Sequence, residues 1–279
     1  MRTSPDGMMI SGTPSRPTGT SMRPRSSACL SAGGDVPLAV IFDGDDTLWI
    51  TEPLYDSARR AVRQIVQVHG LDGEHWEEME RRIDVRNVDS FGHDPARFPA
   101  SCREAYELLC AKSGVSSVAA VTREIEAAAK TVFYSVTPNV EDAAVTLQAL
   151  SELGVKLGLL TKGDRAVQEK RIADSGLDVF FDIIQIVDQK RPAVILDMVR
   201  GVGGRPSTTW LVGNSVRSDI GPALQAGIHA IWIDSHVWEY EKCDSLMNDV
   251  LRLDRLRDVV PHIRAYIEES PSQTPGDKT

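Results

Sequence analysis

The chain has 279 residues and a formal net charge of −9, with 42% apolar and 25% charged residues. This composition is ordinary for a globular protein, and the acidity argues against a general binder of nucleic acid or of anionic membranes. No apolar run reaches the ~18 residues of a membrane span and the N-terminus lacks the apolar stretch of a secretory signal, so a cytoplasmic location is expected.

Both ends of the chain are expected to be disordered. Residues 1–36 are rich in Ser, Pro, Gly, Thr and Arg without apolar periodicity, so they bury too little apolar surface to offset the entropy lost on ordering. Residues 270–279 have the same character. The four cysteines match no metal or redox spacing, which favours free thiols in a reducing compartment; they are Cys29, Cys102, Cys110 and Cys243.

The first predicted element is a short buried strand that ends in acidic residues. In the segment AVIFDGDDTLW, apolar residues precede Asp43, Asp45 and Asp46. Neighbouring carboxylates repel each other unless they share a cation or a proton. Such a pair suits a hard divalent cation such as Mg²⁺, or the divided work of a nucleophile and a proton shuttle. The alternative, from these residues alone, is a helix cap or an Asx turn.

A helical region follows at residues 53–136, with few strand signals. Its first and last helices are predicted over residues 54–70 and 118–133, where apolar residues recur at helical spacing. Loops held by a rigid scaffold often carry recognition, and residues 86–109 are expected to include one. This non-helical loop gathers aromatic, glycine and proline residues: Phe91, Gly92, His93, Pro95, Arg97, Phe98 and Pro99.

From residue 139 onward, helical patterns alternate with apolar strands. The strands are predicted at residues 155–161, 181–187, 208–213 and 229–234, and the helices at residues 139–154, 164–176, 191–203, 219–227 and 253–269. This alternation predicts an α/β fold with a Rossmann-like, doubly wound parallel sheet. Residues 37–52 and 137–269 would form this core, and residues 53–136 an inserted α-helical cap over the carboxyl ends of the strands.

Four motifs occur in order along these elements. FDGDDTLW resembles the DxDxT signature of the haloacid dehalogenase superfamily, with Thr47 as its closing residue. LGLLTKGD resembles the second motif, a strand that ends at Thr161, and Lys190 fits the third, a lysine ahead of a helix. WLVGNSVRSDIGPALQAG resembles the acidic fourth motif. The resemblance covers roughly residues 38–235 and points to the capped, phosphatase-like branch of the superfamily.

The resemblance implies a mechanism that uses two of the aspartates. Asp43 would attack a phosphoryl group to form an aspartyl-phosphate, and Asp45 would protonate the leaving oxygen and then activate water. Mg²⁺ would be bound by the Asp43 carboxylate, the Asp45 backbone carbonyl and the Asp219 carboxylate. Thr161 and Lys190 would hold the phosphoryl oxygens.

Two positions depart from the family pattern. Many relatives carry Asp where this chain has Asn214, which keeps an oxygen acceptor but loses a charge; it could still orient a metal-bound water, while Asp219 would gain importance. Relatives often place Pro directly after the lysine, whereas Arg191 intervenes here. Lys190 is still expected to be the functional lysine, with Lys162 nearby as either a substrate ligand or a solvated loop residue.

Substrate contacts are expected from the strand-end loops and from the cap. They are Thr47, Lys162, Gly163, Arg86, His93 and Arg97. The three cap residues among them would meet a second anionic or polar part of the substrate, or else cap helices and face water. Glu52 and Tyr55 are candidates for the pocket entry, and His236 and Trp238 are expected at the periphery.

The second aspartate favours phosphate over carbon–halogen chemistry, because a leaving alkoxide needs a proton donor and a halide does not. The leading interpretation is a Mg²⁺-dependent phosphomonoesterase for a small soluble phosphate ester, without nucleic-acid or membrane partners. The alternatives are a phosphotransferase or phosphomutase of the same superfamily and a catalytically silent regulatory protein, with a 2-haloacid dehalogenase less favoured. The substrate and the oligomeric state do not follow from the sequence.

Overall fold

The computed structural model describes residues 38–242 and 250–269, so the expected leader and tail, Cys29 and Cys243 lie outside the described residues. Within these ranges, six strands form one parallel sheet in the order β3-β2-β1-β4-β5-β6. The strands are β1 (Ala39–Phe42), β2 (Lys156–Lys162), β3 (Ile183–Val187), β4 (Thr209–Gly213), β5 (His229–Ile233) and β6 (Leu251–Leu253). The predicted α/β fold with a parallel, doubly wound sheet is confirmed.

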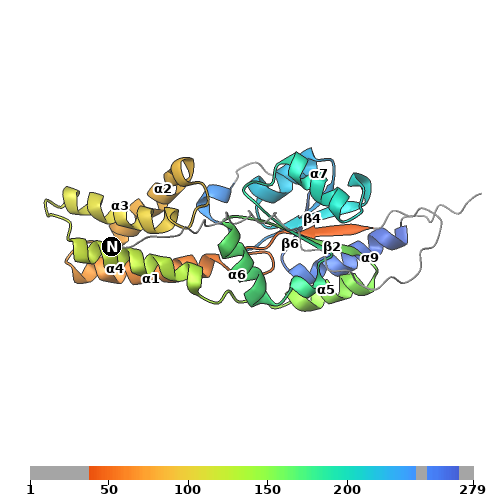
Figure 1. The fold of residues 1–279 in the computed structure, drawn as a ribbon, viewed down its shortest axis with the longest axis horizontal. Helices are drawn as coiled ribbons and strands as arrows, with labels where there is room; N and C mark the ends of the chain where they lie inside the picture. The colour runs from red at the N-terminus through yellow and green to blue at the C-terminus, as the bar shows by residue number, and fades with distance from the viewer. Residues whose placement is uncertain (1–37, 243–249, 270–279) are drawn as a thin grey trace, which may run out of the picture. The chain divides into compact units, whose positions relative to one another are not determined.

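Helices cover both faces of this sheet (Figure 1). Because successive side chains of a strand point to opposite faces, Val40 and Phe42 join an apolar cluster with α5, α6 and α9. Ala39 and Ile41 join a second cluster with α7 and α8 on the other face. These helices are α5 (Ala143–Glu152), α6 (Arg165–Ser175), α7 (Pro192–Gly201), α8 (Gly221–Gln225) and α9 (Val259–Glu269). β1 is therefore buried on both sides, and its end is held rigidly.

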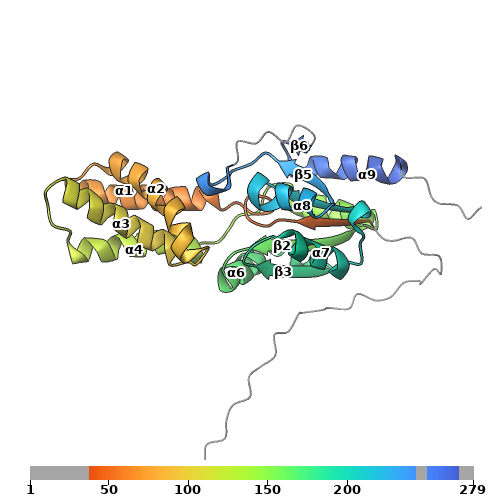
Figure 2. The ribbon, with the colours of Figure 1, turned by 90° about the horizontal axis from the view of Figure 1, so that it is seen from above.

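The helical insertion between β1 and β2 is also confirmed. It consists of α1 (Glu52–Val68), α2 (Gly73–Phe91), α3 (Arg97–Lys112) and α4 (Ala119–Tyr134). In Figure 2 these four helices lie side by side, and they bury an apolar cluster of their own that includes Val62, Trp76 and Ile125. None of the helices in the described residues is long and apolar enough to cross a membrane.

The predicted non-helical loop in the cap is wrong in its extent. α2 continues to Phe91 and α3 begins at Arg97, so the loop is confined to residues 92–96. Phe98 and Pro99 are helical and buried. Pro99 is tolerated because it lies in the first turn of α3, where a backbone N–H has no partner within the helix.

The helix expected over residues 253–269 is also wrong at its start. Residues 251–253 pair with β5 as the edge strand β6, and the α-helix begins only at Val259. A three-residue strand is too short to give a period-two signal, and Pro261 in the first turn of α9 marks the true helix start.

Candidate active site

β1 carries Asp43 to the base of a pocket at the carboxyl edge of the sheet. The Asp43 N–H donates to the Val212 carbonyl at 2.9 Å, which continues the ladder between β1 and β4. Its carboxylate accepts a hydrogen bond from Thr47 Oγ1 at 3.2 Å and contacts Lys190 Nζ. Burial, together with the nearby carboxylate of Asp219, raises the pKa of Asp43 to about 7.

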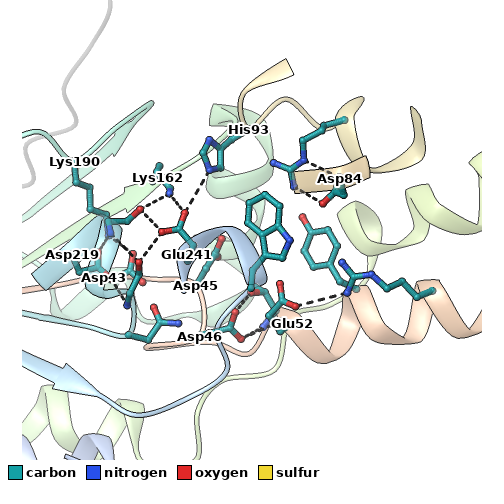
Figure 3. A pocket seen from close by; sticks show the side chains of 18 residues that line it. Asp43, Asp45, Asp46, Glu52, Asp84, His93, Lys162, Lys190, Asp219 and Glu241 are labelled. Carbon is teal, nitrogen blue, oxygen red and sulfur yellow. Dashed lines mark hydrogen bonds and ion pairs between the residues drawn. The ribbon is translucent and has the colours of Figure 1, made fainter. Parts of the chain in front are cut away.

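Lys190 lies between two buried carboxylates. Its Nζ donates to Asp43 and, at 2.6 Å, to Asp219 Oδ1, and these side chains point toward one another in Figure 3. Burial opposes the charge of the lysine, but the two carboxylates raise the pKa of Lys190, so it stays an ammonium. β4 ends at Gly213. A Cβ atom at this position would lie 2.5 Å from the Asp219 carboxyl carbon, so the glycine leaves room for the Asp219 side chain. Of the adjacent pair, Lys190 is buried in the site, whereas Arg191 is exposed.

The other predicted catalytic carboxylate, Asp45, faces α6. Its Oδ2 accepts hydrogen bonds from Gln168 Nε2 at 2.9 Å and Arg171 Nη1 at 2.6 Å, and its Oδ1 accepts one from Trp49 Nε1 at 2.6 Å. Gln168 also accepts a bond from Thr161 Oγ1 at 3.0 Å, and Thr161 is fully buried, outside the lining of the pocket. Gln168 and Arg171 were missed in the sequence, although their i, i+3 spacing on the helix after the Thr161 strand puts both on one face.

Asp46 has a structural role at the start of the cap. It adopts φ 57°, and its carboxylate accepts bonds from Thr51 N at 2.8 Å, Thr51 Oγ1 at 2.5 Å and Glu52 N at 3.1 Å. These bonds satisfy donors at the N-terminus of α1 that have no partner within the helix. The helix-cap alternative therefore applies to Asp46, although Asp46 lines the pocket together with Asp43 and Asp45.

Oxygen atoms suited to a divalent cation gather beside Asp43. Asn214 Nδ2 donates to the His236 carbonyl at 2.7 Å, and this turns its Oδ1 toward Thr47, whose Oγ1 lies 3.4 Å away. Among the residues that the structure describes, no three His, Cys, Asp or Glu side chains form a metal site. The donors are instead the carboxylates of Asp43 and Asp219 and the amide oxygen of Asn214, all of which line the pocket. Hard cations such as Mg²⁺ prefer such oxygen ligands, so the donor set fits this ion.

A segment that follows β5 crosses the pocket. We call residues 235–242 the strap. Glu241 of the strap accepts hydrogen bonds from Lys162 Nζ at 2.5 Å, Ser215 Oγ at 2.7 Å and Ser218 Oγ at 2.5 Å. Sequence reasoning missed Glu241, because the strap has no apolar periodicity and no motif. It also missed Ser215 and Ser218, although both lie inside the fourth motif, between Asn214 and Asp219. The three donors hold a carboxylate inside the pocket.

Cap residues complete the pocket on the opposite side. Arg97 Nε donates to Asp84 Oδ1 at 3.0 Å, and the Arg97 guanidinium lies 4.3 Å from the centroid of the Trp238 ring. His93 also lines the pocket, with Nε2 3.9 Å from Glu241. The expectation that Trp238 is peripheral is wrong, because the strap places its indole in the wall of the pocket.

Glu52 and Tyr55 line the pocket from the first turn of α1. Burial raises the pKa of Glu52 to about 8, although Arg59 Nη1 lies 3.9 Å from its carboxylate. The pocket that all these residues surround encloses about 740 Å³, including the part open to solvent. This size suits a small metabolite.

Three other expected substrate contacts lie elsewhere. Arg86 bonds to Glu104 at 2.5 Å on the surface of the cap and lines neither pocket at this edge. Thr47 is buried under the site, where it orients carboxylate and amide oxygens. Gly163 lines a smaller adjoining pocket, but its N–H donates to the Val187 carbonyl at 3.0 Å. The structure therefore does not bring Arg86 or Thr47 to the pocket wall.

Comparison with known proteins shows the family to which the chain belongs. Residues 37–227 match the model of the haloacid dehalogenase-like hydrolases, and the chain belongs to this family of HAD-type hydrolases. A curated relative is the glyceraldehyde 3-phosphate phosphatase of Methanopyrus kandleri, 26% identical over 240 residues, which cover 83% of this chain and 99% of the relative.

Two solved structures share the fold. A haloacid dehalogenase-like hydrolase from Xanthomonas campestris aligns with a TM-score of 0.67 at 22% identity and covers 83% of this chain and 96% of that protein. The HAD hydrolase YfnB of Bacillus subtilis, solved bound to magnesium, aligns with a TM-score of 0.59 at 16% identity, over 82% of this chain and 100% of YfnB.

Proposed function

We propose that the protein is a Mg²⁺-dependent phosphomonoesterase that acts on a small soluble phosphorylated metabolite through an aspartyl-phosphate intermediate. The observation that carries this proposal is the arrangement of two carboxylates at the end of β1. Asp43 lies against Lys190, and Asp45 lines the same pocket but is held by other partners on α6. Two carboxylates in different settings suit a nucleophile and an acid–base group. The Methanopyrus kandleri relative, a glyceraldehyde 3-phosphate phosphatase, supports phosphatase activity in general.

The residues of the chain account for each step of hydrolysis. A carboxylate oxygen of Asp43 attacks phosphorus, the bond from phosphorus to the ester oxygen breaks, and protonated Asp45 gives its proton to that leaving oxygen. The Asp45 carboxylate then takes a proton from the water that attacks the aspartyl-phosphate, which releases inorganic phosphate and restores Asp43. Lys190 offsets negative charge at the attacking group. Mg²⁺ held by Asp43, the Asp45 backbone carbonyl, Asp219 and Asn214 would neutralise charge on the phosphoryl group.

The test is phosphate release from p-nitrophenyl phosphate and from a panel of metabolite phosphates, with and without Mg²⁺. Asp43→Asn should lower kcat by at least ~10³-fold, because an amide cannot form the covalent intermediate. Asp197→Asn is the matched control, since Asp197 is exposed on α7 and pairs with Arg200. Turnover that survives in Asp43→Asn, or no release from any ester, would contradict hydrolysis by this route. Phosphoryl transfer to an added alcohol in place of release would indicate a phosphotransferase.

A further inference from the structure

The strap places a carboxylate across the end of β1. In the sheet β1 lies between β2 and β4, so a side chain that bridges the ends of β2 and β4 must pass over the end of β1. Glu241 forms such a bridge, because Lys162 is the last residue of β2 and Ser215 and Ser218 follow β4. A phosphate ester that reaches Asp43 therefore meets Glu241 on its way.

The donors around Glu241 form an anion site. Oε1 accepts from the Lys162 ammonium, and Oε2 accepts from the hydroxyls of Ser215 and Ser218, so both oxygens of one carboxylate are bound. His93 Nε2 lies 3.9 Å from Oε1 and is buried without a hydrogen-bond partner among the described residues. The Glu241 and Lys162 side chains are only 12% and 14% exposed, so little water weakens this attraction.

Other contacts anchor the strap without Glu241. On the core side, the strap bonds to Asp46 and Asn214, at 2.6 Å and 2.7 Å. On the cap side, Glu239 pairs with Arg81 at 3.3 Å, and Trp238 lies against Arg97. The Glu241 side chain can therefore leave the donors by rotation while the strap stays in place.

We propose that Lys162, Ser215 and Ser218 form a second anion subsite, which Glu241 fills in the absence of substrate and a carboxylate of the phosphate ester fills during turnover. This inference rests on the proposed phosphatase function and names its substrate class, phosphate monoesters with a carboxylate in the leaving group. Glu241 occupies the same donors in the free protein, so the carboxylate of the ester has to displace it. This competition lowers the apparent affinity of the protein for the ester.

A three-carbon series of esters tests the subsite. The esters 3-phosphoglycerate, glyceraldehyde 3-phosphate and glycerol 3-phosphate differ only in the carboxylate, aldehyde or hydroxymethyl group at the far carbon. The wild type should prefer the carboxylate by about tenfold or more in kcat/KM, the effect of a charge-assisted pair. Glu241→Gln should lower KM for 3-phosphoglycerate about fivefold relative to glycerol 3-phosphate, and Lys162→Met should bring the ratio of the two kcat/KM values close to unity.

Glu239→Gln provides the matched control. It removes a strap carboxylate two residues away that contacts Arg81 rather than the subsite, so the substrate ratio should not change. Asp43-dependent turnover with equal kcat/KM for the three esters would overturn the subsite and leave the phosphatase function intact. A higher KM for glycerol 3-phosphate in Glu241→Gln would also overturn it, because Glu241 would then bind substrate hydroxyls.

If no ester is hydrolysed, the phosphatase function fails and calorimetry tests the subsite by itself. Binding of 3-phosphoglycerate should be tighter in Glu241→Gln than in the wild type and weakest in Lys162→Met. Equal binding of 3-phosphoglycerate and glycerol 3-phosphate to all three proteins would overturn the inference.

Discussion

The base and the rim of the pocket are built in different ways. At the base, Asp43, Asp219 and Lys190 follow strand ends and are almost completely buried. At the rim, Trp238 comes from the strap and Arg97 from the cap; Arg97 is held by Asp84 and the Gly92 carbonyl and lies against the Trp238 ring. Strand pairing and close packing fix the base, whereas hydrogen bonds and ring contacts between side chains of the cap and the strap fix the rim. Under the proposed function the chemistry belongs to the base, and discrimination between substrates belongs to Lys162, Ser215 and Ser218 together with Glu241 of the strap.

Among substitutions at the base of the pocket other than that of Asp43, Asp219→Asn should have the largest effect. The change removes one charge from the proposed metal ligands and from the partners of Lys190, so the Mg²⁺ affinity should fall about 100-fold, together with kcat at limiting Mg²⁺. Mg²⁺ titrations of phosphate release, with calorimetry of Mg²⁺ binding, measure it. The control is Asp234→Asn, which changes a surface carboxylate paired with Arg252. Unchanged Mg²⁺ dependence would remove Asp219 from the metal site.

Arg171→Met should show a smaller effect that depends on the leaving group. Arg171 holds Asp45 at 2.6 Å and is itself buried, so its loss should misplace the acid–base carboxylate. An alkyl phosphate needs protonation of its leaving oxygen, and its kcat should fall about 10- to 100-fold. The nitrophenolate of p-nitrophenyl phosphate leaves without a proton, so its kcat should change little.

Arg165→Met on the same helix is the control, because Arg165 is exposed and contacts Glu169. Equal losses on the alkyl and aryl esters in Arg171→Met would show that Arg171 supports the fold of the site generally. Comparison of the two esters thus separates positioning of the acid from structural support.

The base could be predicted from the sequence for a physical reason. Its residues lie within a few positions of strand ends, and parallel strands deliver their carboxyl ends to one edge of the sheet. Apolar runs mark those strands, so Asp43, Asp45 and Lys190 could be placed at one edge of the sheet without knowledge of the contacts around them, and the resemblance to the family motifs implied their roles. Thr161 was found too, yet the structure buries it against Gln168, a partner that strand patterns do not reveal.

The rim could be predicted only in part, because its position depends on tertiary contacts: Arg97 and His93 of the cap were expected and line the pocket, whereas the strap was missed. The strap has neither helical nor strand periodicity, and its path is set by bonds such as that from Asn214 to the His236 carbonyl. In the cap, Arg86 was proposed as a ligand beside a presumed loop, but it lies on a continuous helix and pairs with Glu104 across to α3. Residue type alone does not tell which face of a cap helix meets the pocket.

The last prediction concerns the pH dependence of stability and Glu52, in the wall of the pocket. Its pKa is raised by burial to about 8 in the folded protein, so folding favours the protonated form. The stabilisation is complete below the ordinary pKa of a glutamate and is lost as the pH rises toward 8. The wild type should therefore lose about 1–3 kcal/mol of unfolding free energy, relative to Glu52→Gln, between pH 5 and pH 8.

Denaturant unfolding of both proteins at the two pH values measures this difference, and other titrating groups cancel because both proteins share them. Glu74→Gln, an exposed carboxylate in the first turn of α2, should unfold in parallel with the wild type at both pH values. If the unfolding free energies of Glu52→Gln and the wild type instead change equally between the two pH values, Arg59, 3.9 Å away, keeps the Glu52 carboxylate charged throughout. Glu52 would then resemble Asp43 and Asp219 at the base of the pocket, whose negative charge is balanced by a fixed partner, Lys190.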